Sequence, residues 1–325
     1  MRLVTYEIKT ALGRHHRLGA LVGETVVDLN FACAWRHEGL GHPAPYRYAD
    51  AHLPATMKAF LEGGKPAMQE ARQLLRDVAA AGRPEGPNEE TLVHDLAAVR
   101  LLAPVPEPNS LRDFYAFEEH VKTGFAKRGE EIPKPWYEIP VYYKGNARTM
   151  IGPDAPSPWP RYTDQLDFEL ELACVIGREG RNIPVEQALD YVAGYTVMND
   201  LSARDIQRKE MACRLGPAKG KDFATAIGPA LVTPDEVGDL SDLPAIVRVN
   251  GEVWSESNAG NPYWSFAQMI AHLSQDETIY PGDILGSGTV GRGCGLELDR
   301  WIRPGDVVEL EIARVGILRT PIGSK

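Results

Sequence analysis

The order of apolar and polar positions in the first eighty residues predicts short strands followed by helix. Apolar runs separated by Gly, His and Arg predict strands at Leu3–Ile8, Leu18–Val22 and Thr25–Leu29. From Pro54 to Ala81 the apolar residues recur at three- and four-residue steps, which is typical of an amphipathic helix. The segment Gly63–Pro66, Gly-Gly-Lys-Pro, is expected to break that helix.

The pattern changes after Gly82–Glu90, which is rich in Pro, Gly and charge and reads as a linker. Val99–Leu102 then begins a series of short apolar runs with turn signals between them. Two of these runs, Pro281–Leu285 and Pro304–Val308, share a Pro-Gly-Asp turn that leads into an aliphatic strand. The sequence thus predicts a mixed α/β, mainly β fold with two domains, at residues 1–98 and 99–325. Few helices are expected after the linker, around Val185–Tyr191, Ser202–Glu210 and Ser265–Leu273.

The net charge and composition limit the classes of molecule that this protein is expected to bind. The chain has 325 residues, a formal net charge of −10 and a pI of about 5.4. Nucleic acids and anionic membranes both require a basic surface, so neither is expected as a partner. No stretch approaches the roughly 18 apolar residues of a membrane span, and the N-terminus lacks the pattern of a signal peptide. We expect a cytoplasmic protein whose four separated cysteines are buried free thiols.

The segment Asp167–Gly177 starts with strict alternation of acidic and apolar residues. In a strand, Asp167, Glu169 and Glu171 would share one face, with neighbouring side chains about 7 Å apart. Three carboxylates repel one another unless water or a cation lies between them. Two interpretations are open: a solvated acidic face, or a site for a hard cation that prefers oxygen ligands.

A second polar group follows the apolar run that ends at Met198. Asp200 would lie at a strand end, where it could also act as a helix N-cap, with Ser202 as the rival. Arg204 and Gln207 are three residues apart and therefore share a helical face. Together these residues could bind a metal and an anionic substrate, or they could be a cap with surface polar groups.

These segments resemble the fumarylacetoacetase family, from about Leu101 to the C-terminus. The markers are LLAPVPEP (Leu101–Pro108), DFYAFEEH (Asp113–His120), PVYYKG (Pro140–Gly145), LDFELELACVIG (Leu166–Gly177), MNDLSARDIQ (Met198–Gln207), LGPAKGKDFATAIGP (Leu215–Pro229), SGTVG (Ser287–Gly291), GLELDRW (Gly295–Trp301) and PGDVVELEIARVGILRTPI near the end. The resemblance implies a β-roll of mixed sheets and at least a homodimer. The N-terminal hundred residues match more weakly.

The resemblance also implies a divalent cation, Mg²⁺, Ca²⁺ or Mn²⁺, and a set of site residues. The metal ligands would be Asp113, Glu169, Glu171 and Asp200, with Lys221 and Thr225 close to the ion, whereas Asp167 would not be a ligand. His120 would be the general base, Glu297 the acid that orients it, and Arg204, Gln207 and Lys221 the groups that stabilise developing negative charge. Tyr115, Arg128, Tyr143, Gln207 and Thr289 would contact the substrate.

Each of these residues also has an ordinary interpretation. A lone His in a helix or loop is usually structural or exposed, Glu297 could belong to the polar face of a strand, and Lys221 could sit in a turn. The motif Gly286–Gly291 satisfies G-x-G-x-x-G, but a dinucleotide site requires a helix to open there. Strand is expected to follow this motif instead, with the glycines letting the backbone approach the substrate.

The implied activity is hydrolysis of a C–C bond in a 1,3-dicarbonyl acid, a small molecule resembling fumarylacetoacetate or an acylpyruvate. His120 would activate water, and the leaving group would depart as an enolate held by the metal, in the catabolism of aromatic compounds such as tyrosine. A different acyl group is suggested by Met211, where the family has a tyrosine, and by Val121–Glu138, which reads as a flap. The alternatives are a decarboxylase, isomerase or dehydratase of the same fold, acting on oxo-acids, or a non-enzymatic metal-stabilised binding protein.

Overall fold

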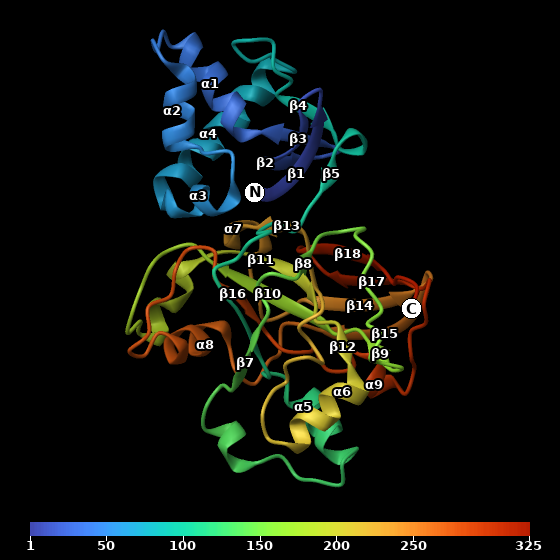
Figure 1. Ribbon diagram of the computed structural model, residues 1–325. Helices are drawn as coiled ribbons and strands as arrows, with labels where there is room; N and C mark the ends of the chain where they lie inside the picture. The colour runs from blue at the N-terminus through green and yellow to red at the C-terminus, as the bar shows by residue number, and fades with distance from the viewer.

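The computed structural model describes residues 1–325, and Figure 1 shows a smaller N-terminal part, blue to teal, next to a larger part, green to red. The strands of the smaller part are β1 (Arg2–Thr10), β2 (Gly13–Val22), β3 (Thr25–Asp28), β4 (Val93–Asp95) and β5 (Arg100–Leu101), and its helices are α1 (Leu29–Gly39), α2 (Pro45–His52), α3 (Met57–Glu62) and α4 (Gly64–Ala81). The three strands predicted here are present. Buried residues on one face of these strands, such as Leu3, Leu18 and Val27, share a hydrophobic core with the helices, so the helices pack as a layer on that face of the sheet.

The predicted helix break is confirmed, because α3 ends at Glu62 and α4 begins at Gly64, whose φ of +57° favours glycine. Helices α1 and α2 were not predicted. The start of α1 has a clear local cause, since the side chain of Asp28 accepts a hydrogen bond from the backbone N–H of Phe31 at 2.8 Å. The segment Gly82–Glu90 contains mainly turns and bends, and it connects α4 to β4 within the smaller part.

A single sheet runs through both parts of the molecule. Its strand order is β4-β3-β2-β1-β13-β11-β10-β16-β6-β7, and β1 joins the two parts by pairing with β13 at Leu3↔Leu231. The junction is also packed, because Leu3 and Leu18 share a hydrophobic core with Ile227 and Leu231. Strand β5 also pairs with β1, so Arg100 and Leu101 belong to this same sheet.

The larger part consists of mixed sheets and short helices. Its strands are β6 (Leu111–Phe114), β7 (Tyr142–Gly145), β8 (Met150–Ile151), β9 (Leu166–Asp167), β10 (Leu170–Ile176), β11 (Val192–Asn199), β12 (Ser202–Ala203), β13 (Thr225–Val232), β14 (Pro244–Val249), β15 (Glu252–Asn258), β16 (Ile284–Gly286), β17 (Val307–Ile312) and β18 (Gly316–Pro321). Its helices are α5 (Glu118–Ala126), α6 (Arg204–Ala212), α7 (Pro234–Val237), α8 (Phe266–Leu273) and α9 (Gly295–Leu298), with 3₁₀ turns η1 (Leu96–Ala98), η2 (Lys134–Tyr137) and η3 (Val185–Tyr191). Parallel pairs, β16 with β6 and β13 with β8, occur beside antiparallel ones, so the predicted mixed β-roll is confirmed.

A second sheet, in the order β15-β14-β17-β18, packs against the large one through β11 and β13. Both Pro-Gly-Asp turns occur as predicted, because Gly282 and Gly305 each have φ of +89° and each precedes a strand. Residues on the inner faces, such as Val197 and Leu310, form the main core between the sheets. No helix is both long and apolar enough to cross a bilayer.

The helix predictions for this part met different outcomes. Ser265 caps α8 with a capping box, as its sequence suggests. The segment Val185–Tyr191 is helical, although as a 3₁₀ turn. Helix α6 begins at Arg204 rather than Ser202, because Ser202 belongs to β12, which pairs with β9. Helix α5 was missed, although its acidic first turn and the four-residue spacing of Phe117 and Val121 were available signals.

Candidate active site

The register of the central strands brings three carboxylates to one place. Asp113 on β6 lies beside Gly286 of β16, Glu171 is the second residue of β10, and Asp200 follows the last residue of β11. A Cβ on Gly286 would lie 2.4 Å from Asp113 Oδ1 and 2.9 Å from Glu171 Oε2. Glycine at this position therefore leaves the space in which the two carboxylates meet.

The three carboxylates form a buried group whose oxygens all lie within 4.8 Å of one another. Asp113 is 3% exposed, and Glu171 and Asp200 are fully buried. Asp167 and Glu169 are buried too, so the solvated acidic face proposed as an alternative is wrong. Burial together with the charge of Asp200 raises the pKa of Asp113 well above its usual range, and burial with the charge of Asp113 does the same to Glu171.

The donors around these carboxylates satisfy only some of their oxygens. The backbone N–H of Gly288 donates to Asp113 Oδ1 at 3.2 Å and to Glu171 Oε2 at 3.0 Å, and Tyr143 Oη donates to Asp200 Oδ2 at 2.8 Å. Glu171 Oε1 and Asp200 Oδ1 are buried without a hydrogen-bond partner. Unpaired carboxylate oxygens that converge are a donor set suited to a hard divalent cation, so these residues fit such an ion.

Glu169 belongs to a neighbouring, charge-paired group. Its carboxylate accepts from Arg204 Nη2 at 2.7 Å and from Lys221 Nζ, which also donates to Asp200. Burial opposes its ionisation, but the charges of Arg204, Lys221 and His120 outweigh burial and lower the pKa of Glu169. Glu169 is thus a fixed anion beside the three carboxylates, and its role as a metal ligand stays a prediction.

Asp167 points away from the three carboxylates because the predicted acidic strand is interrupted. Strand β9 ends at Asp167 and β10 starts at Leu170, in different sheets. The side chain of Asp167 accepts from Arg204 Nε at 2.8 Å and from the backbone N–H groups of Gly295 and Leu296 at 2.8 and 3.0 Å. Asp167 therefore orients Arg204, in line with the expectation that it is not a ligand.

Two other sequence interpretations need correction. Neither Asp200 nor Ser202 caps α6, whose N-cap position is Ala203 without a side-chain hydrogen bond, because Asp200 binds Lys221 and Ser202 lies in β12. Arg204 and Gln207 do share a helical face, and Arg204 Nη1 donates to Gln207 Oε1 at 3.0 Å. Lys221 is 4% exposed and paired with two carboxylates, so it is not simply a turn residue.

His120 and Glu297 form a buried pair on α5 and α9. His120 Nδ1 lies 3.0 Å from Glu297 Oε2, and His120 Nε2 faces Glu169 Oε1 at 3.9 Å. Burial opposes ionisation of Glu297, but the charge of His120 and its hydrogen bond outweigh burial and lower the pKa of Glu297. Figure 1 shows α5, α6 and α9 at the end of the larger part that is remote from the N-terminus.

Cys294 is a member of this group that sequence reasoning missed. Its thiol donates to Glu297 Oε2 at 3.3 Å and lies 4.0 Å from His120 Nδ1. Burial raises the pKa of Cys294 well above its usual range. The available signal in the sequence was its position three residues before Glu297. A single cysteine without a known partner does not by itself indicate a function.

The glycine motif is followed by helix rather than strand. The one-turn α9 holds Glu297, so strand after the motif and a strand face for Glu297 are both wrong predictions. This helix is not the long one of a dinucleotide site, and the motif instead brings two backbone segments together. A Cβ on Gly288, which has φ of +80°, would lie 2.6 Å from Phe114 O. Thr289 is buried in the same loop.

The remaining predicted residues fall into two groups. Tyr115 packs edge-on against His120 with ring centroids 5.3 Å apart, and burial raises its pKa to about 12. Thr225 is buried at the start of β13. Arg128 and Met211, by contrast, are exposed, and Arg128 pairs with Glu130 at 3.2 Å. The structure thus buries Tyr115 and Thr225 and places Arg128 and Met211 at the surface. Arg128 remains close enough to Tyr115 for its charge to oppose the rise in the Tyr115 pKa.

The predicted flap, Val121–Glu138, contains both fixed and exposed segments. Its start belongs to α5, and its end contains η2. Trp136 in η2 is buried and donates from Nε1 to Tyr115 O at 2.8 Å, and Trp264 donates to Trp136 O at 3.0 Å. Most residues between the two helices are exposed, and so are the residues of η2 other than Trp136.

Comparison with known proteins places this geometry in one family. A family described as Fumarylacetoacetate (FAA) hydrolase C-terminal matches residues 110–323. Similar relatives include the human protein named oxaloacetate tautomerase FAHD2A, mitochondrial, 32% identical over 98% of this chain and 90% of its own length. Another is oxaloacetate tautomerase YisK of Bacillus subtilis, 31% identical over 83% of this chain and 87% of its own.

Solved structures share the fold over the whole chain. Maleylpyruvate hydrolase from Sphingobium sp. SYK-6 superposes with a TM-score of 0.70 at 22% identity, covering 100% of both chains. The same enzyme in complex with manganese(II) and pyruvate gives a TM-score of 0.67 at 23% identity, covering 99% of both chains. At these identities the likeness establishes the fold.

Proposed function

The chain belongs to the fumarylacetoacetate hydrolase family, and from that premise we propose that it is a divalent-cation-dependent enzyme that forms the enolate of a small 2-oxo acid. The substrate class has a second carbonyl or carboxyl group two carbons from the first, as in oxaloacetate or an acylpyruvate. The observation that carries the proposal is the adjacency of two arrangements, the converging carboxylates Asp113, Glu171 and Asp200 and the His120–Glu297 pair.

The His120–Glu297 pair supplies a base of defined tautomer. Because Glu297 is a carboxylate that accepts from Nδ1, the proton of a neutral His120 resides on Nδ1, and Nε2 is free to take a proton. Nε2 faces the interior near Glu169, on the side of the carboxylates. A substrate methylene next to a carbonyl, or a water molecule, placed there could lose its proton to His120.

Three further side chains would stabilise the negative charge that develops on the substrate. Lys221 and Arg204 are buried cations, and Gln207 is fixed by Arg204. Such preorganised donors are typically worth about 3–4 kcal/mol each in the transition state. Asp113, Glu171 and Asp200, with Glu169 as a further candidate, would hold the cation, which when bound supplies Lewis acidity and a template for two substrate oxygens.

Tautomerisation of an oxo-acid such as oxaloacetate is the reaction we propose first. It requires only proton transfer to and from carbon and stabilisation of the enolate, and all of the groups described above serve these two needs. Several relatives that align over nearly the whole chain, including the human protein, are named oxaloacetate tautomerases.

Hydrolysis of a C–C bond in an acylpyruvate-like acid is the second candidate. The specific observation that favours it is the buried His120–Glu297 pair, which could activate water as readily as carbon. After addition of water to the distal carbonyl, the bond to the methylene carbon breaks and pyruvate leaves as its enolate. Both candidates pass through an enolate. They differ in how it forms, by loss of a proton from carbon in tautomerisation and by attack of water with C–C cleavage in hydrolysis.

One experiment separates the two. The protein is incubated with Mn²⁺ or Mg²⁺ and either the enol form of oxaloacetate or an acylpyruvate, and both enol absorbance and pyruvate release are followed. Faster loss of oxaloacetate enol without new products supports tautomerisation, and release of pyruvate and a second acid supports hydrolysis. His15→Ala, at an exposed position on β2, is the matched control for His120→Ala. No cation-dependent reaction with any member of a broad dione and oxo-acid panel would refute the proposal.

We also propose a homodimer and a cytoplasmic location. Sedimentation of the purified protein tests the first, since a monomer at micromolar concentration would contradict it. Cell fractionation tests the second, and recovery in an organelle, as the human relative's name indicates for that protein, would contradict it.

A further inference from the structure

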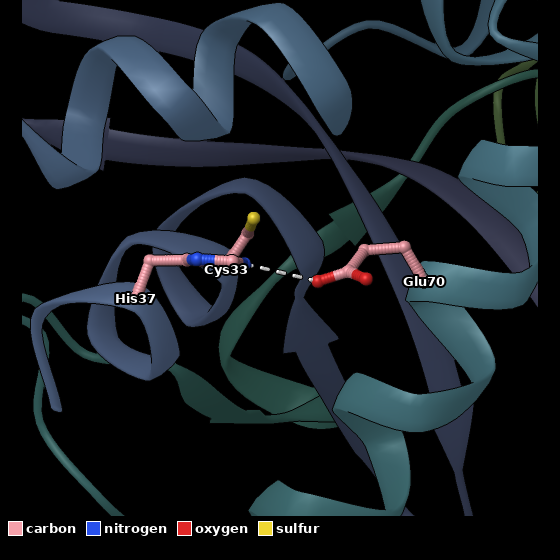
Figure 2. A group of neighbouring side chains, drawn as sticks. All are labelled: Cys33, His37 and Glu70. Atoms are coloured by element: carbon pink, nitrogen blue, oxygen red, sulfur yellow. Dashed lines mark hydrogen bonds and ion pairs between the residues drawn. The ribbon is translucent and has the colours of Figure 1, made fainter. Parts of the chain in front are cut away.

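The N-terminal part contains a second group of metal-ligating side chains, far from the carboxylates. Cys33 and His37 lie one turn apart on α1, and Glu70 approaches them from α4 (Figure 2). The thiol, a ring nitrogen and a carboxylate oxygen all lie within 4.8 Å of one another. Residues four apart on a helix share a face, so α1 presents two ligands in the same direction.

We propose that Cys33, His37 and Glu70 form a binding site for a thiophilic divalent ion of the zinc type, which joins α1 to α4. A thiolate, an imidazole and a carboxylate are the donors that Zn²⁺ accepts, and thiolate disfavours Mg²⁺ or Ca²⁺. In a tetrahedral zinc site, donor atoms lie roughly 3.3–3.8 Å apart. His37 Nε2 and Glu70 Oε1 already lie 3.2 Å apart, so binding requires mainly that the Cys33 thiol approach them by up to about 1 Å. Water takes the fourth position.

The surroundings hold the donors in place. His37 Nε2 already contacts Glu70 Oε1 at 3.2 Å, the interaction drawn in Figure 2. Tyr48 packs on the His37 ring with centroids 3.8 Å apart, which fixes the plane of the imidazole. Cys33 is fully buried, while the side chains of His37 and Glu70 are 13% and 26% exposed, so an ion can enter from the surface.

Local charge also accommodates the ion. Arg36 pairs with Glu70 at 2.7 Å and with Asp77 at 2.7 Å, so one cation faces two carboxylates. Burial, with the charge of Glu70, raises the pKa of the Cys33 thiol to about 12, so the free protein keeps it protonated at neutral pH. The thiol proton passes to solvent as the sulfur–metal bond forms. The charges of Zn²⁺, thiolate, Glu70, Asp77 and Arg36 then sum to zero.

Cobalt(II) gives a readout that the carboxylate site cannot give. The whole protein is titrated with Co²⁺ in the presence of excess Mg²⁺. The near-ultraviolet thiolate-to-cobalt charge-transfer band is recorded. Zn²⁺ is then expected to abolish the band. Cys33→Ala should remove the band, and Cys174→Ala, another buried thiol but on β10, should keep it. Cys294→Ala should also keep it, which separates the site from the thiol beside His120.

A second variant covers the case in which Cys33→Ala does not fold. His37→Gln changes a partly exposed ring and should weaken Zn²⁺ binding at least about tenfold, measured by competition with a chromophoric chelator. Zn²⁺ should raise the Tm of the parent protein and not that of His37→Gln. The proposal is overturned if the parent shows no band, if Cys294→Ala rather than Cys33→Ala removes it, or if His37→Gln binds Zn²⁺ as tightly as the parent.

Discussion

Glu171→Gln should stabilise the protein in the absence of metal and remove its response to divalent cations. Glu171 is fully buried, Oε1 has no partner, and its neighbours are other carboxylates. A glutamine keeps the acceptor for Gly288 N–H and supplies an amide donor to Asp113 or Asp200. Relief of the unpaired buried acid should contribute about 1–3 kcal/mol. For a chain of this size, each kcal/mol raises Tm by about 2 °C.

The response to cation should change in the opposite direction. When the free cation concentration is a hundred times Kd, binding stabilises the parent protein by about 2.7 kcal/mol. If the affinity is weakened a hundredfold, binding at the same concentration stabilises the protein by only about 0.4 kcal/mol. Thermal unfolding with and without Mn²⁺, after treatment with chelator, measures both effects. The parent should therefore gain several degrees from Mn²⁺, and Glu171→Gln almost none.

Asp167→Asn is the matched control, since it makes the same chemical change at another fully buried acid. Every hydrogen-bond partner of Asp167 donates to it, namely Arg204 and the N–H groups of Phe168, Gly295 and Leu296. An amide has one acceptor oxygen in place of two, so the variant should lose about 2–4 kcal/mol. Its Mn²⁺-induced shift should remain. A lower metal-free Tm for Glu171→Gln, or a higher one for Asp167→Asn, would refute the reasoning.

Three further predictions concern the chemistry of the site. His120→Ala should lower kcat about 10²–10⁴-fold while the Mn²⁺ Kd from calorimetry is unchanged; retained activity would contradict its role as the base. Because the pKa values of Asp113 and Glu171 are raised, these acids still bind protons well above pH 3.8. Mn²⁺ affinity should therefore rise with pH, by up to about tenfold per pH unit for each proton displaced. The stability of the metal-free protein should fall over the same pH range. A Kd independent of pH would contradict this. Cys294→Ala removes a donor to Glu297 and should reduce kcat about 2–10-fold with KM unchanged; a thousandfold loss would show that the thiol itself reacts.

Much of the fold could be predicted because its signals are local. Apolar runs predicted β1, β2 and β3, and the Pro-Gly-Asp turns predicted the starts of β16 and β17. The helix expected around Ser265–Leu273 is present as α8. The pairing of β1 with β13 could not be predicted, because residues 3 and 231 are brought together by the packing of both cores and not by any short-range pattern.

For the site, too, the sequence determined some features and the tertiary structure decided others. The sequence alone determined which acids, bases and cations are present, and the family resemblance predicted that Asp113, Glu169, Glu171 and Asp200 act together. Only the tertiary structure decided that the acidic strand breaks before Glu169, so that Asp167 turns to Arg204. It also decided that Cys294 lies against Glu297. The physical reason is that a buried charge takes its orientation from donors supplied by distant segments, and those donors exist only once the sheets have paired.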